Sequence, residues 1–205
     1  MFSGIVKGLV EVNDVEKKRG LTTFSVTAQK NIFSVIKTGA SVSIDGVCLT
    51  ASKIDRQKIF FDVMQETLDK TTLKYLEKNQ LVNIERSIKA GDEIGGHIVS
   101  GHVHGEAEIV KVEEAENNKK NVFKCDKNLI KYIFPKGFIA LDGVSLTVVD
   151  VDKKQGTFTV CLIPETLKLT TFGFKNMGDF VNLEIDQQTR TIVDTVEAVL
   201  GNLNK

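Results

Sequence analysis

Hydrophobic and polar residues alternate with a period of two along most of this 205-residue chain. This alternation is typical of half-buried β-strands, and the Asp-Gly pairs at 45–46 and 142–143 are typical of tight hairpin turns. Strands do not alternate with long helices, so the pattern predicts an antiparallel all-β protein with about six short strands in each half. Closing those strands into a small barrel would leave no unpaired edge. The predicted strands are 24–27, 42–44, 47–52, 59–63, 81–85, 107–110, 157–160 and 181–185, together with the strands that flank residues 142–143.

Three segments depart from this alternation and are predicted to be helical. Residues 31–36 and 128–133 each carry apolar residues at helical spacing. The tail, 187–205, is predicted to be an amphipathic helix because its apolar residues recur at helical intervals along one face. Those residues are Ile192, Val196, Val199 and Leu200. We expect this face to make subunit contacts, and the alternative is that it packs back on its own barrel.

The sequence contains an internal repeat. Ser3-Gly4 matches Ser100-Gly101 at a shift of 97 residues, and Glu66-Thr67-Leu68 matches Glu165-Thr166-Leu167 at a shift of 99. The period is too long for a solenoid or a propeller, so it predicts a tandem duplication of one domain. We expect a first barrel at 1–97, a second barrel at 98–186 and a helix at 187–205. The patterned segment 87–101 between the repeats is predicted to be a structured crossover and not a flexible linker.

Composition excludes several classes of protein. Twenty-seven basic and 27 acidic residues cancel, and no basic stripe indicates a nucleic-acid partner. The three cysteines, Cys48, Cys125 and Cys161, form no CxxC pair and predict no disulfide framework. No apolar stretch has the length of a membrane span, and the first residues lack the pattern of a signal peptide. We therefore expect a soluble cytoplasmic protein.

Polar residues that recur in both repeats indicate two binding sites for the same or similar small molecules. The alternative is that they are turn and strand-end residues kept for folding. The matched pairs are Thr50 with Thr147, Glu66 with Glu165 and Thr67 with Thr166.

Chemistry is expected where the repeats differ. His102 stands opposite Ile5, and Ser145 stands opposite Cys48. The second repeat also has Asp186 where the first has a serine. The second repeat therefore holds a histidine that could transfer protons near neutral pH, a hydroxyl and a carboxylate.

The three histidines do not predict a metal site. Strand spacing would put His102 and His104 on one face and His97 on the other, with no nearby cysteine to complete a tetrahedral set. His97 follows two glycines and is predicted to be a turn histidine with satisfied hydrogen bonds. Cys48 has no histidine next to it in sequence, so a packing or polar-contact role is as well supported as a nucleophilic one.

Several motifs, in order along the whole chain, resemble those of riboflavin synthase of the alpha-chain type. They are Met1-Phe2-Ser3-Gly4-Ile5-Val6, Gly46-Val47-Cys48-Leu49-Thr50, the crossover from Gly95 to His102, Asp142 to Thr147, and Ile163 to Thr166. The resemblance implies two six-stranded Greek-key barrels and a trimerising C-terminal helix. It also implies a reaction without metal or cofactor, in which one 6,7-dimethyl-8-ribityllumazine donates four carbons to another. The products are riboflavin and 5-amino-6-ribitylamino-2,4(1H,3H)-pyrimidinedione.

The resemblance further implies that the first barrel of one subunit and the second barrel of a neighbour hold the substrate pair. It places the acid–base chemistry on His102, Ser145 and Thr147, with Asp186 nearby. Cys48 and Ser41 belong to the first barrel's half of the site. That half is also expected to include Leu49, Thr50, Asp62, Val63, Met64, Gln65, Glu66 and Thr67, with Gly4, Ile5 and Val6 at its edge. The second half is expected to include Lys136, Cys161, Leu162, Ile163, Pro164, Glu165 and Thr166. Gly101, Val103 and Leu146 are further expected substrate contacts.

Small departures and one alternative accompany this resemblance. Ser3 stands where threonine is common, Asp45 where asparagine is common and His104 where aspartate is frequent. The alternative is a lumazine- or flavin-binding antenna protein on the same duplicated fold, without catalysis. Association with a lumazine synthase shell, as in some relatives, is a further partnership that the resemblance allows.

Overall fold

The computed structural model describes residues 1–27 and 36–203. Its order of elements is β1 (Gly8–Lys18), β2 (Leu21–Thr27), β3 (Ser41–Ile44), β4 (Val47–Asp55), β5 (Lys58–Met64), α2 (Gln65–Lys70), η1 (Thr72–Tyr75), β6 (Leu81–Arg86), β7 (Gly105–Ala115), β8 (Asn118–Cys125), α3 (Lys127–Ile130), β9 (Phe138–Leu141), β10 (Val144–Asp152), β11 (Thr157–Leu162), α4 (Pro164–Leu169), η2 (Thr171–Gly173), β12 (Phe180–Ile185) and α5 (Gln187–Leu203).

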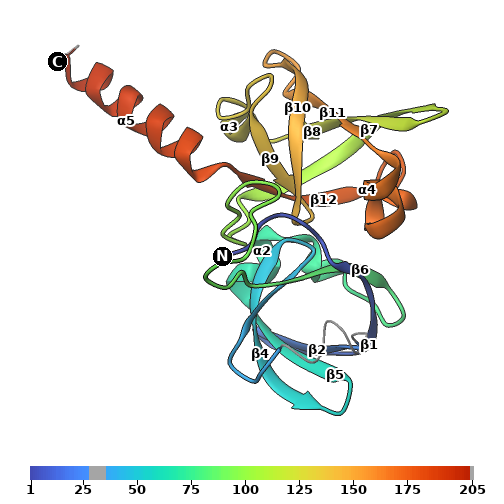
Figure 1. The fold of residues 1–205 in the computed structure, drawn as a ribbon. Helices are drawn as coiled ribbons and strands as arrows, with labels where there is room; N and C mark the ends of the chain where they lie inside the picture. Colours follow the sequence, from blue (N-terminus) through green and yellow to red (C-terminus); the bar gives the residue numbers. More distant parts are fainter. Residues whose placement is uncertain (28–35, 204–205) are drawn as a thin grey trace.

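The strands form two closed antiparallel barrels of six strands each (Figure 1). The first has the order β1-β2-β5-β4-β3-β6, and the second repeats the same cyclic order with β7 to β12. Strands β3, β4 and β5 are joined by hairpins and β2 returns beside β5, which is a Greek key. The predicted fold class is confirmed.

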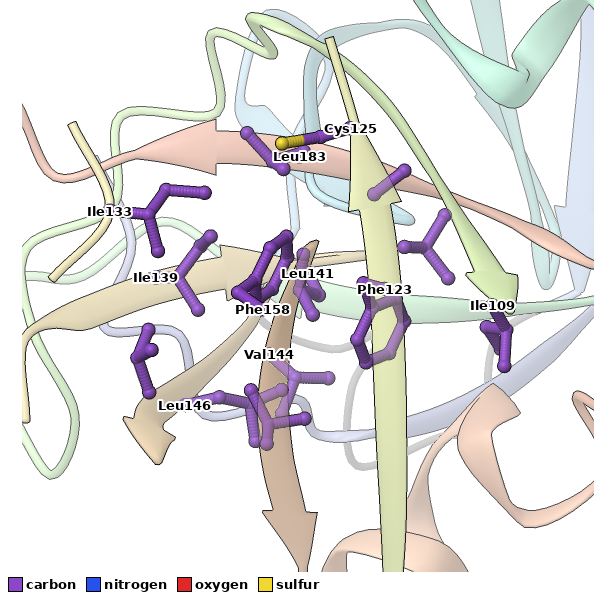
Figure 2. Packing of buried hydrophobic residues seen from close by; sticks show 14 of the residues in the cluster. Ile109, Phe123, Cys125, Ile133, Ile139, Leu141, Val144, Leu146, Phe158 and Leu183 are labelled. Carbon is purple, nitrogen blue, oxygen red and sulfur yellow. The ribbon is translucent and has the colours of Figure 1, made fainter. Parts of the chain in front are cut away.

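Each barrel encloses its own apolar core. In the first, the rings of Phe24 and Phe61 lie 5.3 Å apart. In the second, the stacked rings of Phe123 and Phe158 lie 5.4 Å apart, and Phe172 meets Phe123 edge-on. Figure 2 shows Phe123 and Phe158 within this cluster. These inward residues occupy alternate positions of their strands, which is why alternation located most of the strands correctly.

Two strands were missed by the sequence analysis, β1 and β8. In β1 a bulge between Val12 and Asp14 interrupts the alternation, and the rest of the strand is exposed and charged. In β8 the inward residues include Lys119 and Asn121, which are buried although they are polar. Buried polar residues interrupt the hydrophobic alternation, so a search for alternation does not find such a strand.

The helix predictions were partly right. The predicted helix at 31–36 lies outside the described residues except for Ile36, and the one at 128–133 is a single turn, α3, which begins one residue earlier. Asp126 is the N-cap of α3, and its side chain accepts a hydrogen bond from the backbone N–H of Asn128 (2.7 Å). Two short helices, α2 and α4, were missed, because six residues are too few to show a helical period.

The tail is the predicted amphipathic helix, α5, and it projects away from both barrels (Figure 1). Its apolar face is open: Ile192 is 64 % exposed and Val196 is 51 % exposed. Polar contacts tie it to the second barrel, where Tyr132 Oη donates to Asp194 Oδ1 (2.5 Å). The alternative that its apolar face packs back on its own barrel is therefore wrong.

Candidate functional site

Two related pockets lie on the molecule, one on each barrel. The first-barrel pocket has a volume of about 260 Å³ and the second-barrel pocket about 210 Å³. Each is bounded by the start of a hairpin strand, a short helix and a segment from the other repeat. The first is lined by Val47, Cys48, Glu66, Thr67, Lys70, Thr71, Gly101, His102 and Val103. The second is lined by Gly4, Ile5, Val6, Val144, Ser145, Ile163, Glu165, Thr166, Leu169 and Thr170.

The repeats exchange the segments that close these pockets. The backbone N–H of Ser145, in the second repeat, donates to the carbonyl oxygen of Gly4 (2.8 Å). The backbone N–H of Cys48, in the first repeat, donates to the carbonyl oxygen of Gly101 (2.8 Å). Phe2 and Val99 pair where the two segments pass each other. Gly4, Ile5 and Val6 therefore lie at the second-barrel pocket, and their expected position at the edge of the first is wrong.

Close backbone approach explains the glycine at each crossing. Gly4 and Gly101 have φ angles of +72° and +81°. A Cβ atom at Gly4 would lie 2.6 Å from that of Ser145, and one at Gly101 would lie 2.5 Å from that of Cys48. Only glycine combines this backbone conformation with so little space.

A buried glutamate anchors each exchanged segment. Glu85 accepts hydrogen bonds from the backbone N–H (2.8 Å) and hydroxyl (2.7 Å) of Ser3. Glu184 does the same for Ser100 and also accepts from the N–H of Gly101 (2.9 Å). Burial raises the pKa of both carboxyls, and the serine hydrogen bonds oppose that rise. Strands β6 and β12 carry these glutamates at matched positions, at the end of Val82-Asn83-Ile84-Glu85 and of Val181-Asn182-Leu183-Glu184, and therefore hold the pocket walls in place.

A polar seam joins the barrels at the two Asp-Gly turns. The backbones meet so closely that a Cβ atom at Gly46 would lie 2.5 Å from the nitrogen of Gly143. Asn83 donates through its side-chain amide to the carbonyl oxygen of Asp142 (3.0 Å), and Asn182 donates to that of Asp45 (2.7 Å). The repeated asparagines are thus reciprocal ties between the domains.

The two aspartates of the seam form an asymmetric carboxyl pair, Asp45 and Asp142. Each accepts a hydrogen bond of 2.7 Å from a backbone N–H, of Asn83 or Asn182. Lys175 Nζ lies 3.0 Å from Asp142 Oδ2. Burial, and then the neighbouring Asp142, raise the pKa of Asp45 to about 8. Burial also raises the pKa of Asp142, but Lys175 opposes this, so Asp45 is the member that holds a proton at pH 7.

The two groups expected to act together, His102 and Ser145, lie in different pockets of the chain. His102 is exposed in the first-barrel pocket with Cys48, although it belongs to the second repeat. Ser145 lines the second-barrel pocket, where its Oγ lies 2.6 Å from His97 Nδ1.

His97 is the contact of Ser145 that the sequence analysis did not find. It is 7 % exposed and stacks on Phe138, with ring centroids 5.1 Å apart. Burial lowers its pKa against the opposing effect of Asp186, so the ring is neutral at pH 7. The feature of the sequence that could have indicated this contact is Gly96, where a Cβ atom would lie 2.6 Å from the Cβ atom of Ser145. That glycine lets the crossover reach the serine.

The other predicted residues lie at different distances from the pockets. Asp186 caps α5, where its Oδ2 accepts from the N–H (2.9 Å) and hydroxyl (2.7 Å) of Thr189. His104 Nδ1 accepts a hydrogen bond from the backbone N–H of Ile185 (3.2 Å), and its Nε2 lies 2.9 Å from a guanidinium nitrogen of Arg190. His104 therefore links the end of β12 to the first turn of α5. In the described structure several predicted residues lie beyond the pocket linings, on strands, turns or the first residue of a short helix: Ser41, Leu49, Thr50, Asp62, Val63, Met64, Gln65, Lys136, Leu146, Thr147, Cys161, Leu162 and Pro164.

Within residues 1–27 and 36–203, no cluster of three or more His, Cys, Asp or Glu side chains could hold a metal ion. No helix in that part of the chain is long and apolar enough to cross a membrane.

Comparison with known proteins identifies the family. The lumazine binding domain matches residues 3–87 and again 100–186. Riboflavin synthase of Escherichia coli K12 is 46% identical over 202 residues, which cover 98% of this chain and 94% of that protein. The chain belongs to the riboflavin synthase family. The riboflavin synthase of Chlamydia pneumoniae is likewise 46% identical, over 205 residues and 100% of both chains.

Solved structures of LumP with bound ligands have a fold similar to that of this chain. LumP complexed with riboflavin superposes on this member of the riboflavin synthase family with a TM-score of 0.85. The identity is 26%, and the match covers 91% of this chain and 100% of LumP. LumP complexed with 6,7-dimethyl-8-(1'-D-ribityl) lumazine gives a TM-score of 0.83 at 25% identity. The duplicated barrel is therefore shared by proteins that bind lumazines and flavins.

Proposed function

We propose that this protein is a riboflavin synthase, which converts two molecules of 6,7-dimethyl-8-ribityllumazine into riboflavin and 5-amino-6-ribitylamino-2,4(1H,3H)-pyrimidinedione. One observation carries the proposal: a chain 46% identical to riboflavin synthases over its full length builds two pockets on one plan. Two like substrates need two like pockets. The atoms balance between substrates and products, so the dismutation needs no external oxidant or reductant.

Holding both substrates in contact would supply most of the rate. Alignment of two bound reactants can remove about 7–11 kcal/mol from a bimolecular barrier. A positioned acid or base adds about 10²–10⁴-fold. We assign proton transfer to His102 in the first-barrel pocket, next to Cys48. Ser145, held by its contact with His97, would offer a hydroxyl to the partner substrate.

The proposed pair requires that a first-barrel pocket meets a second-barrel pocket. His102 and Ser145 line different pockets of one chain, which is consistent with a site completed between subunits. The open apolar face of α5 supports association of subunits through this helix, and the resemblance to the family makes that assembly a homotrimer. We assign residues 1–97 and 98–186 to the two barrels and 187–205 to the assembly helix. Thr147, Asp186 and Ser41 stay predicted members of the assembled site, as do the other residues beyond the single-chain pockets.

The surroundings of the enzyme are part of the proposal. All three cysteines are free, as expected in a reducing compartment, and we place the enzyme in the cytoplasm. Association with lumazine synthase would shorten the path of the substrate to these pockets.

The deciding experiment is a time course of purified protein with 6,7-dimethyl-8-ribityllumazine alone, followed by absorbance and fluorescence. We expect one pyrimidinedione for each riboflavin formed. His102→Gln should lower turnover by about 10²-fold or more while lumazine binding persists. His104→Gln is the matched control, because this histidine lies outside both pocket linings in the described structure. Tight binding of lumazine without turnover would instead favour an antenna protein of the LumP kind.

A further inference from the structure

The two pockets share a backbone plan but differ in charge. In the first-barrel pocket, Lys70 stands at the end of α2 and its Nζ lies 3.1 Å from Glu66 Oε1. His102 adds an imidazole and Cys48 adds a thiol. The carboxylate of this pocket is therefore balanced by one lysine, with an imidazole beside it.

The second-barrel pocket lacks this balance. Its carboxylate, Glu165, matches Glu66, but the position that matches Lys70 is Leu169 and the one that matches His102 is Ile5. Glu165 is the one ionisable side chain among the described residues of its lining. At neutral pH this pocket is negative and largely apolar, so it disfavours a bound anion.

The proposed reaction makes its two substrates unequal in charge. The methyl group on C7 of one lumazine loses a proton to solvent or to a base. Its C–H electron pair then spreads over the electron-poor ring, which becomes a monoanion. The other lumazine stays neutral while a nucleophile adds to it. Two pockets of different charge can therefore sort two identical molecules into different roles.

We propose that Lys70 makes the first-barrel pocket the site of the lumazine anion, and that the second-barrel pocket holds the neutral partner. This assignment rests on the function proposed above. Lys70 acts as a specificity-determining residue, because it stabilises one ionisation state of a ligand that both pockets accept. The side chain of Lys70 is 59% exposed, so water screens its effect. The expected shift in the pKa of the bound lumazine is about half a unit, which is a threefold change in the ratio of anion to neutral form.

A pH titration of bound lumazine tests the assignment. The full-length protein is saturated with 6,7-dimethyl-8-ribityllumazine in a stopped-flow instrument, and the absorbance of the anion is read before turnover. The wild-type protein is expected to show two apparent pKa values, one for each pocket. Lys70→Met, which keeps the length of the stem, should raise the lower value by about half a unit. Lys70→Arg should restore it.

The mirror substitution provides the matched control. Leu169→Lys gives the second pocket the missing cation, so it should lower the higher pKa and leave the lower one in place. A single pKa in the wild-type protein, or a lower pKa that Lys70→Met does not move, would overturn the assignment. Steady-state turnover of the wild-type protein keeps the two questions apart. Riboflavin formation with an unmoved pKa refutes only the role of Lys70, whereas absence of turnover refutes the proposed function.

Discussion

The carboxyl pair at the seam makes the stability of this protein depend on pH, and Asp45→Asn should reduce that dependence. Asp45 is 4 % exposed, and no lysine pairs with it directly in the described structure, since Lys175 lies against Asp142. Folding therefore buries Asp45 in its protonated form at neutral pH. Asparagine has nearly the same shape, can accept the bond from the N–H of Asn83 and tolerates the φ of +43° found at this position.

The sign and size follow from the raised pKa. The folded carboxyl titrates at about 8 and the unfolded one at 3.8, so the folded state binds the proton more tightly. Its contribution to stability is complete below pH 4 and is lost as pH rises towards 8, at about 1.4 kcal/mol per pH unit. Between pH 5 and pH 8 the wild-type protein can lose up to about 4 kcal/mol that the variant keeps. The advantage of Asp45→Asn should therefore grow with pH.

Urea unfolding at pH 5, 6.5 and 8, at one protein concentration, measures this difference. We expect a gap between Asp45→Asn and the wild-type protein that widens by at least about 2 kcal/mol over this range. Asp150→Asn removes an exposed carboxylate and should give a gap that does not change with pH. A gap for Asp45→Asn that stays constant, or narrows as pH rises, would refute the assignment of the proton to Asp45.

Three further predictions concern the crossing, the seam and the helix. Gly101→Ala puts a methyl group 2.5 Å from Cβ of Cys48. In urea unfolding, the free energy of unfolding should fall by about 2 kcal/mol or more, and lumazine should bind more weakly. An unchanged free energy and affinity would contradict the close approach. Lys175→Met leaves the buried Asp142 carboxylate without its lysine. The free energy of unfolding should fall by about 3–5 kcal/mol at pH 8, and by less at pH 5 because protonation of the carboxylate reduces its charge. An equal fall at both pH values would argue against the ion pair. Val196→Glu changes an exposed position of α5, so the melting temperature should hardly move while sedimentation shows smaller assemblies; an unchanged sedimentation coefficient would exclude assembly through this face.

Sequence patterns were sufficient for the architecture because the information was local. Each Asp-Gly turn and each run of alternating residues specifies its own hairpin, and the repeat doubles the evidence. The failures occurred where burial is not apolar. Lys119 is buried because its Nζ donates to the carbonyl oxygen of Lys175 (2.8 Å), a partner that lies 56 residues away.

The site was less predictable because its parts come together only in three dimensions. Matching Ile5 with His102 showed that the two residues are equivalent, but each lies on the barrel of the other repeat. The partnership of His97 with Ser145 spans 48 residues, and no spacing rule connects them. Sequence matching therefore indicated polar groups of both pockets, but it could not show which residues of the two repeats lie side by side in one chain.

The exchanged segments also constrain how the protein is made. The first-barrel pocket needs Gly101 to Val103, which leave the ribosome after the whole of β1 to β6. The second-barrel pocket needs Gly4 to Val6, which are synthesised first and must wait, without their partner, for Ser145. Domains usually fold in order as a chain emerges, but here neither pocket can close on a nascent half. The first-barrel pocket is thus complete only after synthesis has passed Val103 and the second only after it has passed Thr170, so a chain that stops before Gly101 lacks part of the lining of both pockets.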